Sequence, residues 1–255
     1  MTLDDIKASL PDYKKTSDAK HFWVRFFVRP LSFPVTWMLL KVGLSANQVT
    51  FASIALSGAA GWFYSQGGYS QFIIAAGLSH GALLLDSVDG NMARATGTSG
   101  PLGWMLDTVG ADLFYIAFFI PIGIGLINSP DYEPLVGDSE WVFLGMGTLA
   151  SVSVLFYRLF RYRVHEATAQ IAGAATSQSQ GSSEASKRSF IRRAFPVIYG
   201  NVVPPTGTVL PVVTVMAVLG LMDYFVWIYG IGVAAVVATV ALVQLLRVTA
   251  RASAR

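Results

Sequence analysis

Six apolar runs, each close to the length that crosses a lipid bilayer, dominate this chain of 255 residues. A hydrocarbon core needs roughly 20 residues per helix. The runs cover residues 47–66, 69–93, 101–127, 140–163, 206–222 and 224–246, with only Asp223 separating the last two. With 53% hydrophobic residues, 13% charged residues and a mean hydropathy of +0.53, the chain is a poor fit to a soluble globular class. The sequence predicts an all-α membrane protein with six transmembrane helices.

The distribution of lysine and arginine predicts which way the helices run. Basic side chains collect in cytoplasmic loops. In a six-helix arrangement one side holds Lys14, Lys15, Lys20, Arg25, Arg29, Arg94, Arg161, Arg163, Lys187, Arg188, Arg192, Arg193, Arg247, Arg251 and Arg255. The other side has no lysine or arginine and carries Asp131, Glu133, Asp138, Glu140 and Asp223. We therefore expect both termini in the cytoplasm, and the plasma (inner) membrane as the location if the source is bacterial.

The first 43 residues differ from the rest. Residues 1–15 are polar and contain no signal-peptide core. Residues 22–42 mix Phe, Trp and Leu with Arg25, Arg29 and Lys41, and are interrupted by Pro30 and Pro34. That pattern favours an amphipathic helix lying at the membrane interface. We predict a cytoplasmic and juxtamembrane segment over 1–43 and a six-helix membrane domain over 44–255, with a Ser/Gln/Gly-rich linker at 174–193.

Net charge and cysteine content exclude several functions. The formal charge is +3 and the basic residues flank apolar runs, so they are expected to meet anionic lipid headgroups and not nucleic acid. The chain has no cysteine, which excludes disulfides, thiolate metal sites and cysteine nucleophiles. Faces of small residues in the apolar runs permit a homodimer.

Carboxylates inside the apolar runs are the candidate functional site, because ionised groups near hydrocarbon are costly. Asp86 and Asp89 lie three residues apart, hence on one helix face, and Asp107 enters on the next helix. Oxygen ligands of this kind suit Mg²⁺ or Mn²⁺, which share their coordination with substrate phosphates. Gly90 and Gly103 permit close approach of a nucleotide or a backbone, and Arg94 offers a forked donor to phosphate. Metal-assisted phosphoryl transfer follows, with carboxylates that merely pair with arginine as the alternative.

The residues Asp86, Asp89, Gly90, Ala93, Arg94, Gly103 and Asp107 have the spacing of the signature of the CDP-alcohol phosphotransferases (CDP-alcohol phosphatidyltransferases), which this chain resembles over residues 14–163. Residues 44–50, LSANQVT, are similar to the family's Ser-Pro-Asn-x-x-Thr sequence, with Ala46 replacing proline. The resemblance implies six transmembrane helices, a site open to the cytoplasm, and transfer of a phosphoalcohol from a CDP-alcohol to a hydroxyl with release of CMP.

The same resemblance implies residue roles. Two metal ions would be held by Asp86, Asp89 and Asp107, and the nucleotide would contact Asn47, Asp86, Gly90, Ala93, Arg94 and Gly103. For Asn47 and Ser45 a simple helix N-cap is the alternative.

One position departs from the family pattern. The aspartate expected four residues after Asp107, the family's general base, is Ala111, and the nearest carboxylate is Asp112. On a regular helix, position 111 lies about 40° from Asp107 and Asp112 about 140° away. We hypothesise that a π-bulge near Gly110 turns Asp112 into the site as base and further metal ligand. An unbroken α-helix with Asp112 facing lipid or another helix would contradict this.

The sequence says least about the identity of the donor and of the second substrate, the acceptor. Arg158, Arg161 and Arg163 are candidates for binding an acceptor phosphate, or else anchor the helix end at the membrane. His80 is expected to be a hydrogen-bonded interior side chain and not a ligand. The preferred donor is CDP-diacylglycerol with a polar alcohol acceptor, as in phospholipid synthesis. A CDP-linked polyol or inositol donor, a non-catalytic nucleotide- or lipid-binding homologue, and a cation transporter stay open as alternatives.

Overall fold

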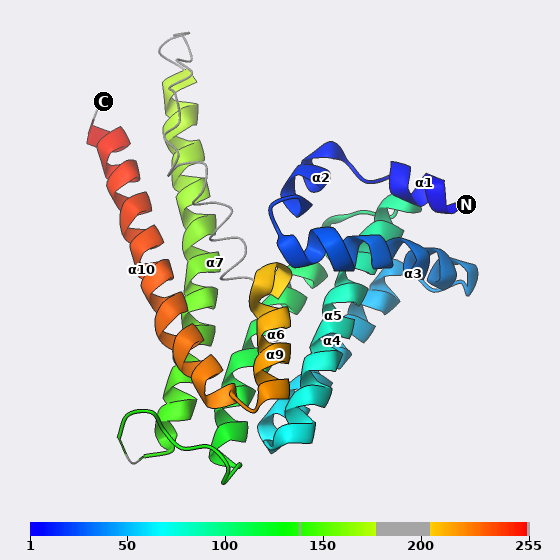
Figure 1. The fold of residues 1–255 in the computed structure, drawn as a ribbon. Helices are drawn as coiled ribbons and strands as arrows, with labels where there is room; N and C mark the ends of the chain where they lie inside the picture. The colour runs from blue at the N-terminus through cyan, green and yellow to red at the C-terminus, as the bar shows by residue number, and fades with distance from the viewer. Residues whose placement is uncertain (138, 177–204, 254–255) are drawn as a thin grey trace.

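The computed structural model describes residues 1–137, 139–176 and 205–253, and every regular element in these ranges is a helix (Figure 1). The predicted linker at 174–193 lies almost wholly outside the described residues. Six helices, α4, α5, α6, α7, α9 and α10, run alternately in opposite directions. The N-terminus, the turn between α5 and α6, and the carboxyl ends of α7 and α10 lie at the same end (Figure 1). The all-helical prediction is confirmed.

The boundaries of α4, α5 and α6 follow from local sequence. Helix α4 spans Ala46–Gln66, and at its start Ser45 and Gln48 form a reciprocal capping box. Gly67, with φ of 72°, ends it. Helix α5 spans Tyr69–Ala95 and α6 spans Pro101–Ile127, with Pro101 in the first turn, where its missing N–H costs nothing. These bounds lie within two residues of those predicted.

Helix α7 (Trp141–Thr176) is much longer than the predicted segment at 140–163. Nothing in residues 164–176 stops a helix, because this part is rich in alanine and contains a single glycine and no proline. On the surface, Arg163 and Glu166 form an i,i+3 ion pair of 3.1 Å between Nη1 and Oε2. The helix therefore continues beyond its apolar part.

The last pair of helices breaks at a different place from the one predicted. The π-helical turn η2 (Pro205–Val209) leads into α9 (Leu210–Leu219), and α9 ends at Gly220, whose φ of 69° is left-handed. Helix α10 (Met222–Ser253) starts directly afterwards and includes Asp223 in its first turn. The prediction that Asp223 separates the two helices is wrong, because a glycine C-cap ends a helix more effectively than one acidic residue.

Four helices of the described residues are long and apolar enough to cross a membrane: Tyr69–Ala95, Pro101–Ile127, Trp141–Ala169 and Met222–Leu246. The apolar helix Gly207–Leu219 is shorter than a membrane span. Helix α4 has the length and no charged residue, but its buried Thr50, Ser53 and Ser57 make it too polar. The structure supports an integral membrane protein, and the full count of six transmembrane helices stays a prediction.

The bundle is held together where glycines let helix backbones touch. A Cβ on Gly61 would lie 2.7 Å from the carbonyl oxygen of Ala117, and one on Gly123 would lie 2.5 Å from that of Phe143. These contacts bring α4 and α7 against α6. Around them, buried aromatic side chains such as Phe118 and Phe225 pack edge to face, with ring centroids 6.3 Å apart.

The N-terminal segment packs across one end of the bundle and comprises α1 (Leu3–Ala8), α2 (Asp12–Asp18), the π-helical turn η1 (Val24–Val28) and α3 (Arg29–Lys41). Helix α3 contacts α5 through a polar face, whose buried residues are Arg29, Ser32 and Thr36. Its apolar residues Leu31 and Met38 are exposed. A helix is thus present where one was predicted, and its location at a membrane interface stays a prediction.

Candidate active site

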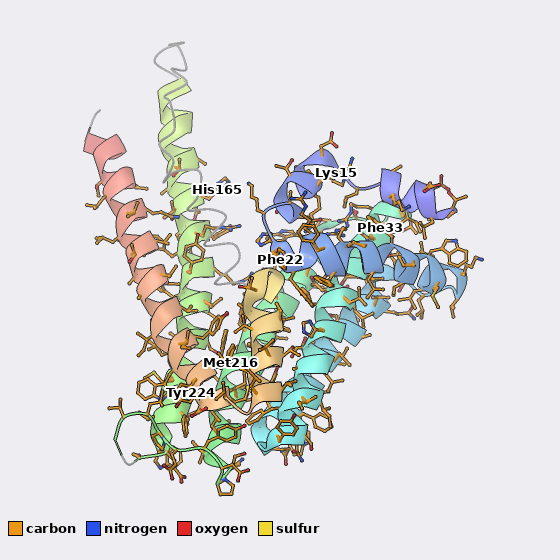
Figure 2. The ribbon with its side chains drawn as sticks, viewed as in Figure 1. Lys15, Phe22, Phe33, His165, Met216 and Tyr224 are labelled. Atoms are coloured by element: carbon orange, nitrogen blue, oxygen red, sulfur yellow. The ribbon has the colours of Figure 1, made fainter. Side chains whose placement is uncertain are left out.

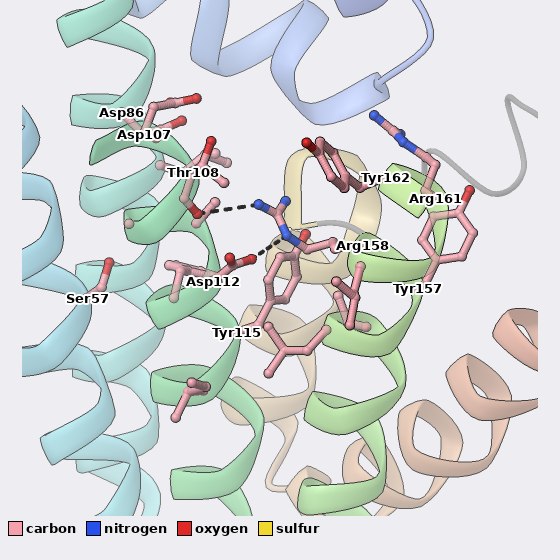
Figure 3. Close-up of a pocket in the computed structure, with 18 of the residues that line it drawn as sticks. Ser57, Asp86, Asp107, Thr108, Asp112, Tyr115, Tyr157, Arg158, Arg161 and Tyr162 are labelled. Atoms are coloured by element: carbon pink, nitrogen blue, oxygen red, sulfur yellow. Dashed lines mark hydrogen bonds and ion pairs between the residues drawn. The ribbon is translucent and has the colours of Figure 1, made fainter. Parts of the chain in front are cut away.

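A cavity of about 1360 Å³ lies between α4, α5, α6, α7 and α10, and the N-terminal segment forms part of its wall. The charged and polar residues of its wall include Lys14, Thr50, Ser53, Asp86, Asp107, Asp112, Arg158 and Arg161. Figure 3 shows Asp86 and Asp107 together at one side of the cavity, Arg158 and Arg161 on α7 at the other, and Asp112 reaching from α6 towards Arg158. The cavity thus joins an acidic region to a basic one.

Three motif carboxylates make up the acidic region. Asp86 and Asp107 line the cavity, whereas Asp89 is buried and accepts a hydrogen bond of 2.5 Å from Thr50 Oγ1. The negative charges of the three side chains repel one another. Grouping like charges in a poorly hydrated region is unfavourable unless a cation offsets them.

The donor set of the acidic region suits a hard divalent cation, since all its ligands are carboxylate or hydroxyl oxygens. Among the described residues, no three His, Asp or Glu side chains converge closely enough to form a ready metal-binding group. The predicted convergence of Asp86, Asp89 and Asp107 on metal ions is therefore not seen directly and stays a prediction. Asp86 and Asp107 face the cavity, where an ion with phosphate ligands has room.

The π-bulge hypothesis for Asp112 is wrong. Helix α6 is α-helical from Pro101 to Ile127 without interruption. Gly110 packs against α4, because a Cβ there would lie 3.2 Å from Ile54 Cγ1. Asp112 turns towards α7 and accepts a hydrogen bond of 2.5 Å from Arg158 Nε (Figure 3). An arginine on the neighbouring helix gives the carboxylate a partner without any distortion of the backbone.

Arg158 is the centre of the basic region. Its guanidinium carbon lies 5.6 Å from the ring centroid of Tyr115, and its Nη2 lies 3.4 Å from the carbonyl oxygen of Thr108. Arg161 also lines the cavity (Figure 3). Arg163 does not, because it is exposed and pairs with Glu166. Of the three predicted acceptor-binding arginines, two lie at the cavity.

The predicted nucleotide-binding residues, apart from Asp86, are not part of the cavity wall: Asn47, Gly90, Ala93, Arg94 and Gly103. Asn47 is exposed, and the cap of α4 is Ser45. The guanidinium of Arg94 lies over Gly90, where a Cβ would come within 3.2 Å of Arg94 Nη1. A side chain at position 90 would therefore be in tight contact with Arg94, whose flexible end would have to shift by a few tenths of an ångström.

A buried polar network behind the motif was not predicted from the sequence. Arg29 Nε donates to Asp18 Oδ2 at 2.7 Å, and Arg29 Nη1 donates to Asn91 Oδ1 at 2.9 Å. Asn91 Oδ1 also accepts from Arg94 Nη2 at 2.9 Å, and Asn91 Nδ2 donates to Ser32 Oγ at 3.0 Å. An amide inside an apolar run was the signal available, since such a group needs partners when buried.

His80 has the interior role predicted for it. Trp23 Nε1 donates to His80 Nδ1 at 3.2 Å, and His80 Nε2 lies 2.9 Å from Thr214 Oγ1. The side chain links the N-terminal segment to α5 and α9 and is not part of the cavity wall. The prediction of a hydrogen-bonded structural histidine is confirmed.

Comparison with known proteins identifies the family of the chain. No curated protein sequence matches the chain significantly. The family model for CDP-alcohol phosphatidyltransferase matches residues 44–245, which include the motif carboxylates, most of the cavity wall and the arginines of α7. Members of that family transfer a phosphoalcohol from a CDP-alcohol to an acceptor. Because the match covers most of its length, the chain belongs to the CDP-alcohol phosphatidyltransferase family.

Proposed function

We propose that this protein transfers a phosphoalcohol from CDP-diacylglycerol to a polar acceptor hydroxyl and releases CMP, as a step of phospholipid synthesis. The observation that carries the proposal is a single cavity with Asp86 and Asp107 at one side and Arg158 at the other. Phosphoryl transfer needs both features, because a diphosphate has to be neutralised while a second substrate is held beside it.

The acidic region is the proposed metal site. Asp86, Asp89 and Asp107 would hold two Mg²⁺ or Mn²⁺ ions, which neutralise the diphosphate and polarise the phosphoryl group under attack. Thr50 contributes by fixing the orientation of the Asp89 carboxylate through its 2.5 Å hydrogen bond. Partners of this kind hold a ligand in the geometry that the metal requires.

The cytidine end of the donor is proposed to bind along the cytoplasmic end of α5. Arg94 is half-buried, already hydrogen-bonded to Asn91, and has room over Gly90. Gly90, Ala93 and Gly103 offer a surface without bulky side chains, and no heavy atom lies within 4 Å of the Cβ position of Gly103. Asn47 completes the proposed nucleotide contacts at the start of α4.

The basic region is proposed to bind the acceptor through Arg158 and Arg161. Asp112 uses Oδ1 to hold Arg158 Nε, which directs the guanidinium towards the cavity. We therefore assign Asp112 the role of positioning Arg158 in place of its predicted roles as a base and metal ligand. For Arg163 we propose the alternative role, anchoring the end of the apolar part of α7 at the membrane.

A lipid donor suits the walls of the cavity. Alongside the charged groups they include Ile54, Leu83, Phe114, Ile116 and Leu159, so that a headgroup and the start of an acyl chain find matching surfaces. The first half of α6 also exposes large apolar residues, among them Leu102 and Met105. With the basic ends of the helices in the cytoplasm, the cavity opens to the cytoplasmic leaflet.

The test is release of CMP by the purified protein with Mn²⁺ and a panel of CDP-alcohols that includes CDP-diacylglycerol and CDP-linked polyols. We expect turnover with the lipid donor and its loss in Asp89→Asn, while Asp131→Asn, an exposed loop carboxylate, keeps it. Turnover only with a polyol donor would replace the proposed substrate. Thermal stabilisation by CDP without turnover of any donor would identify a non-catalytic nucleotide-binding protein, which the alanine at position 111 makes the specific alternative.

A further inference from the structure

The structure points to a ligand-binding role for the N-terminal segment that the family match, which begins at residue 44, does not cover. We propose that Lys14 on α2 binds the diphosphate of the CDP-alcohol. This inference rests on the proposed function, because it names a further residue of the same donor site.

The position of Lys14 carries the inference. Lys14, Ser17, Lys20 and His21 line the same cavity as Asp86, although they come from a segment that precedes the bundle in the sequence. Lys14 lies close enough to Asp86 for the two charges to attract. A cation opposite a metal-binding carboxylate is well placed for an anion that lies between them.

Lys14 can change partners at little cost. Its Nζ is 3.9 Å from Asp18 Oδ1, which is too long for a hydrogen bond, and its side chain is 39% exposed. A lysine ammonium is a compact charge on a flexible stem, so it can swing to a phosphate without moving the backbone. A diphosphate brings more negative charge than the single carboxylate that Lys14 has beside it.

The segment that carries Lys14 is firmly attached. Asp18, at the end of α2, is buried in an ion pair with Arg29, and Arg29 in turn donates to Asn91 within the motif helix α5. Ile6 and Leu10 are buried as well. Breaking a buried ion pair by removing one charge is strongly unfavourable. The network therefore holds α2 at the cavity. Figure 1 shows the N-terminal helices packed against the end of the bundle.

The neighbouring lysine provides a matched control. Lys15 has the same charge on the same helix, but it pairs with Asp12 at 2.9 Å and is not part of the cavity wall. Figure 2 labels it on α2. If positive charge near the membrane favoured CDP binding only in a general way, removal of either lysine charge would weaken binding equally.

The experiment measures the affinity of the full-length protein for CDP and for CMP with Mn²⁺ present, in wild type, Lys14→Gln, Lys14→Arg and Lys15→Gln. For Lys14→Gln we expect CDP binding weaker by about tenfold, the typical value of a charge-assisted hydrogen bond. We expect a smaller loss for CMP, recovery in Lys14→Arg to within about threefold, and no change in Lys15→Gln. If the site is selective for a diphosphate, inorganic phosphate should displace CDP no better from the wild type than from Lys14→Gln.

A second variant tests the attachment of the segment. Asp18→Asn should weaken CDP binding less in Lys14→Gln than in the wild-type background, because the part of its contribution that acts through Lys14 is then already lost. Equal CDP affinities for Lys14→Gln and Lys15→Gln would overturn the inference, and so would a loss for Lys14→Gln that Lys14→Arg does not restore. Failure of the wild type to bind CDP would instead refute the proposed function.

Discussion

Asp112 can act either as a positioning residue for Arg158 or as a general base, and the two roles predict losses of rate on its replacement that differ by orders of magnitude. Its carboxylate accepts a 2.5 Å hydrogen bond from Arg158, and the two side chains are 42% and 33% exposed. Replacement by asparagine removes the charge and keeps an oxygen that can accept from Arg158 Nε. Replacement by alanine removes both. The two variants therefore separate the charge of residue 112 from its hydrogen bond.

The expected losses follow from the exposure of the pair. For an ion pair that is a third or more exposed, solvent screening limits the contribution to about 1 kcal/mol. At 1.36 kcal/mol per factor of ten, this corresponds to about a fivefold change in rate. Removal of a general base typically costs about 10²- to 10⁴-fold. The positioning role thus predicts a loss of about fivefold or less for Asp112→Asn, and a larger one for Asp112→Ala.

The assay is the rate of CMP release with Mn²⁺ and CDP-diacylglycerol at saturating and at limiting acceptor. Loss of a positioned Arg158 should raise the KM for the acceptor more than it lowers kcat, and Arg158→Gln should show the same pattern. In the double variant Asp112→Ala/Arg158→Gln the losses should not add, since both act on one contact. A loss of rate above about 100-fold, equal in Asp112→Asn and Asp112→Ala, would refute the positioning role and support a role of Asp112 as general base.

Further predictions concern the metal site and the packing of the bundle. Thr50→Val removes the hydroxyl that holds Asp89, so we expect Mn²⁺ affinity, measured by titration calorimetry, to fall by about 10- to 100-fold, with Thr50→Ser close to wild type. Chelation of divalent ions should abolish CMP release, and Mn²⁺ should restore it. Gly125→Ala drives a Cβ into the carbonyl oxygen of Tyr64 and should destabilise the protein by about 1–3 kcal/mol in thermal unfolding, whereas Gly145→Ala meets open space and should not.

The sequence was sufficient where a local rule decides the structure. The starts of α4 and α6 are determined by the Ser45–Gln48 capping box and by Pro101, and both were predicted to within one residue. The break before α10 was predicted at Asp223, but α9 ends at Gly220, whose φ is left-handed. A hydropathy profile gives long apolar runs accurately, but it does not locate a helix cap inside a nearly continuous run.

The candidate site was predicted less completely, because its contacts join helices distant in the sequence. The spacing of Asp86, Asp89 and Asp107 predicts a shared region, and Asp86 and Asp107 do line one cavity. Position 112 was assigned from the helical angle about a single axis, which cannot reveal that Arg158 on α7 is within reach. Contacts of this kind depend on how α6 packs against α7, which no spacing rule within one helix describes.

The unusual amphipathicity of α3 connects the membrane surface to the site. Most helices at a protein surface bury their apolar face, whereas α3 exposes Leu31 and Met38 and buries Arg29 and Ser32 against α5. An exposed apolar face is unfavourable in water and favourable against acyl chains, which supports the predicted interfacial location. The buried face is hydrogen-bonded to Asn91 of α5, whose amide oxygen also accepts from Arg94 of the motif. Because one hydrogen-bond network joins α3 to Arg94, an α3 that lies at the lipid surface would set the position of the proposed nucleotide site relative to the membrane from which the proposed lipid donor comes.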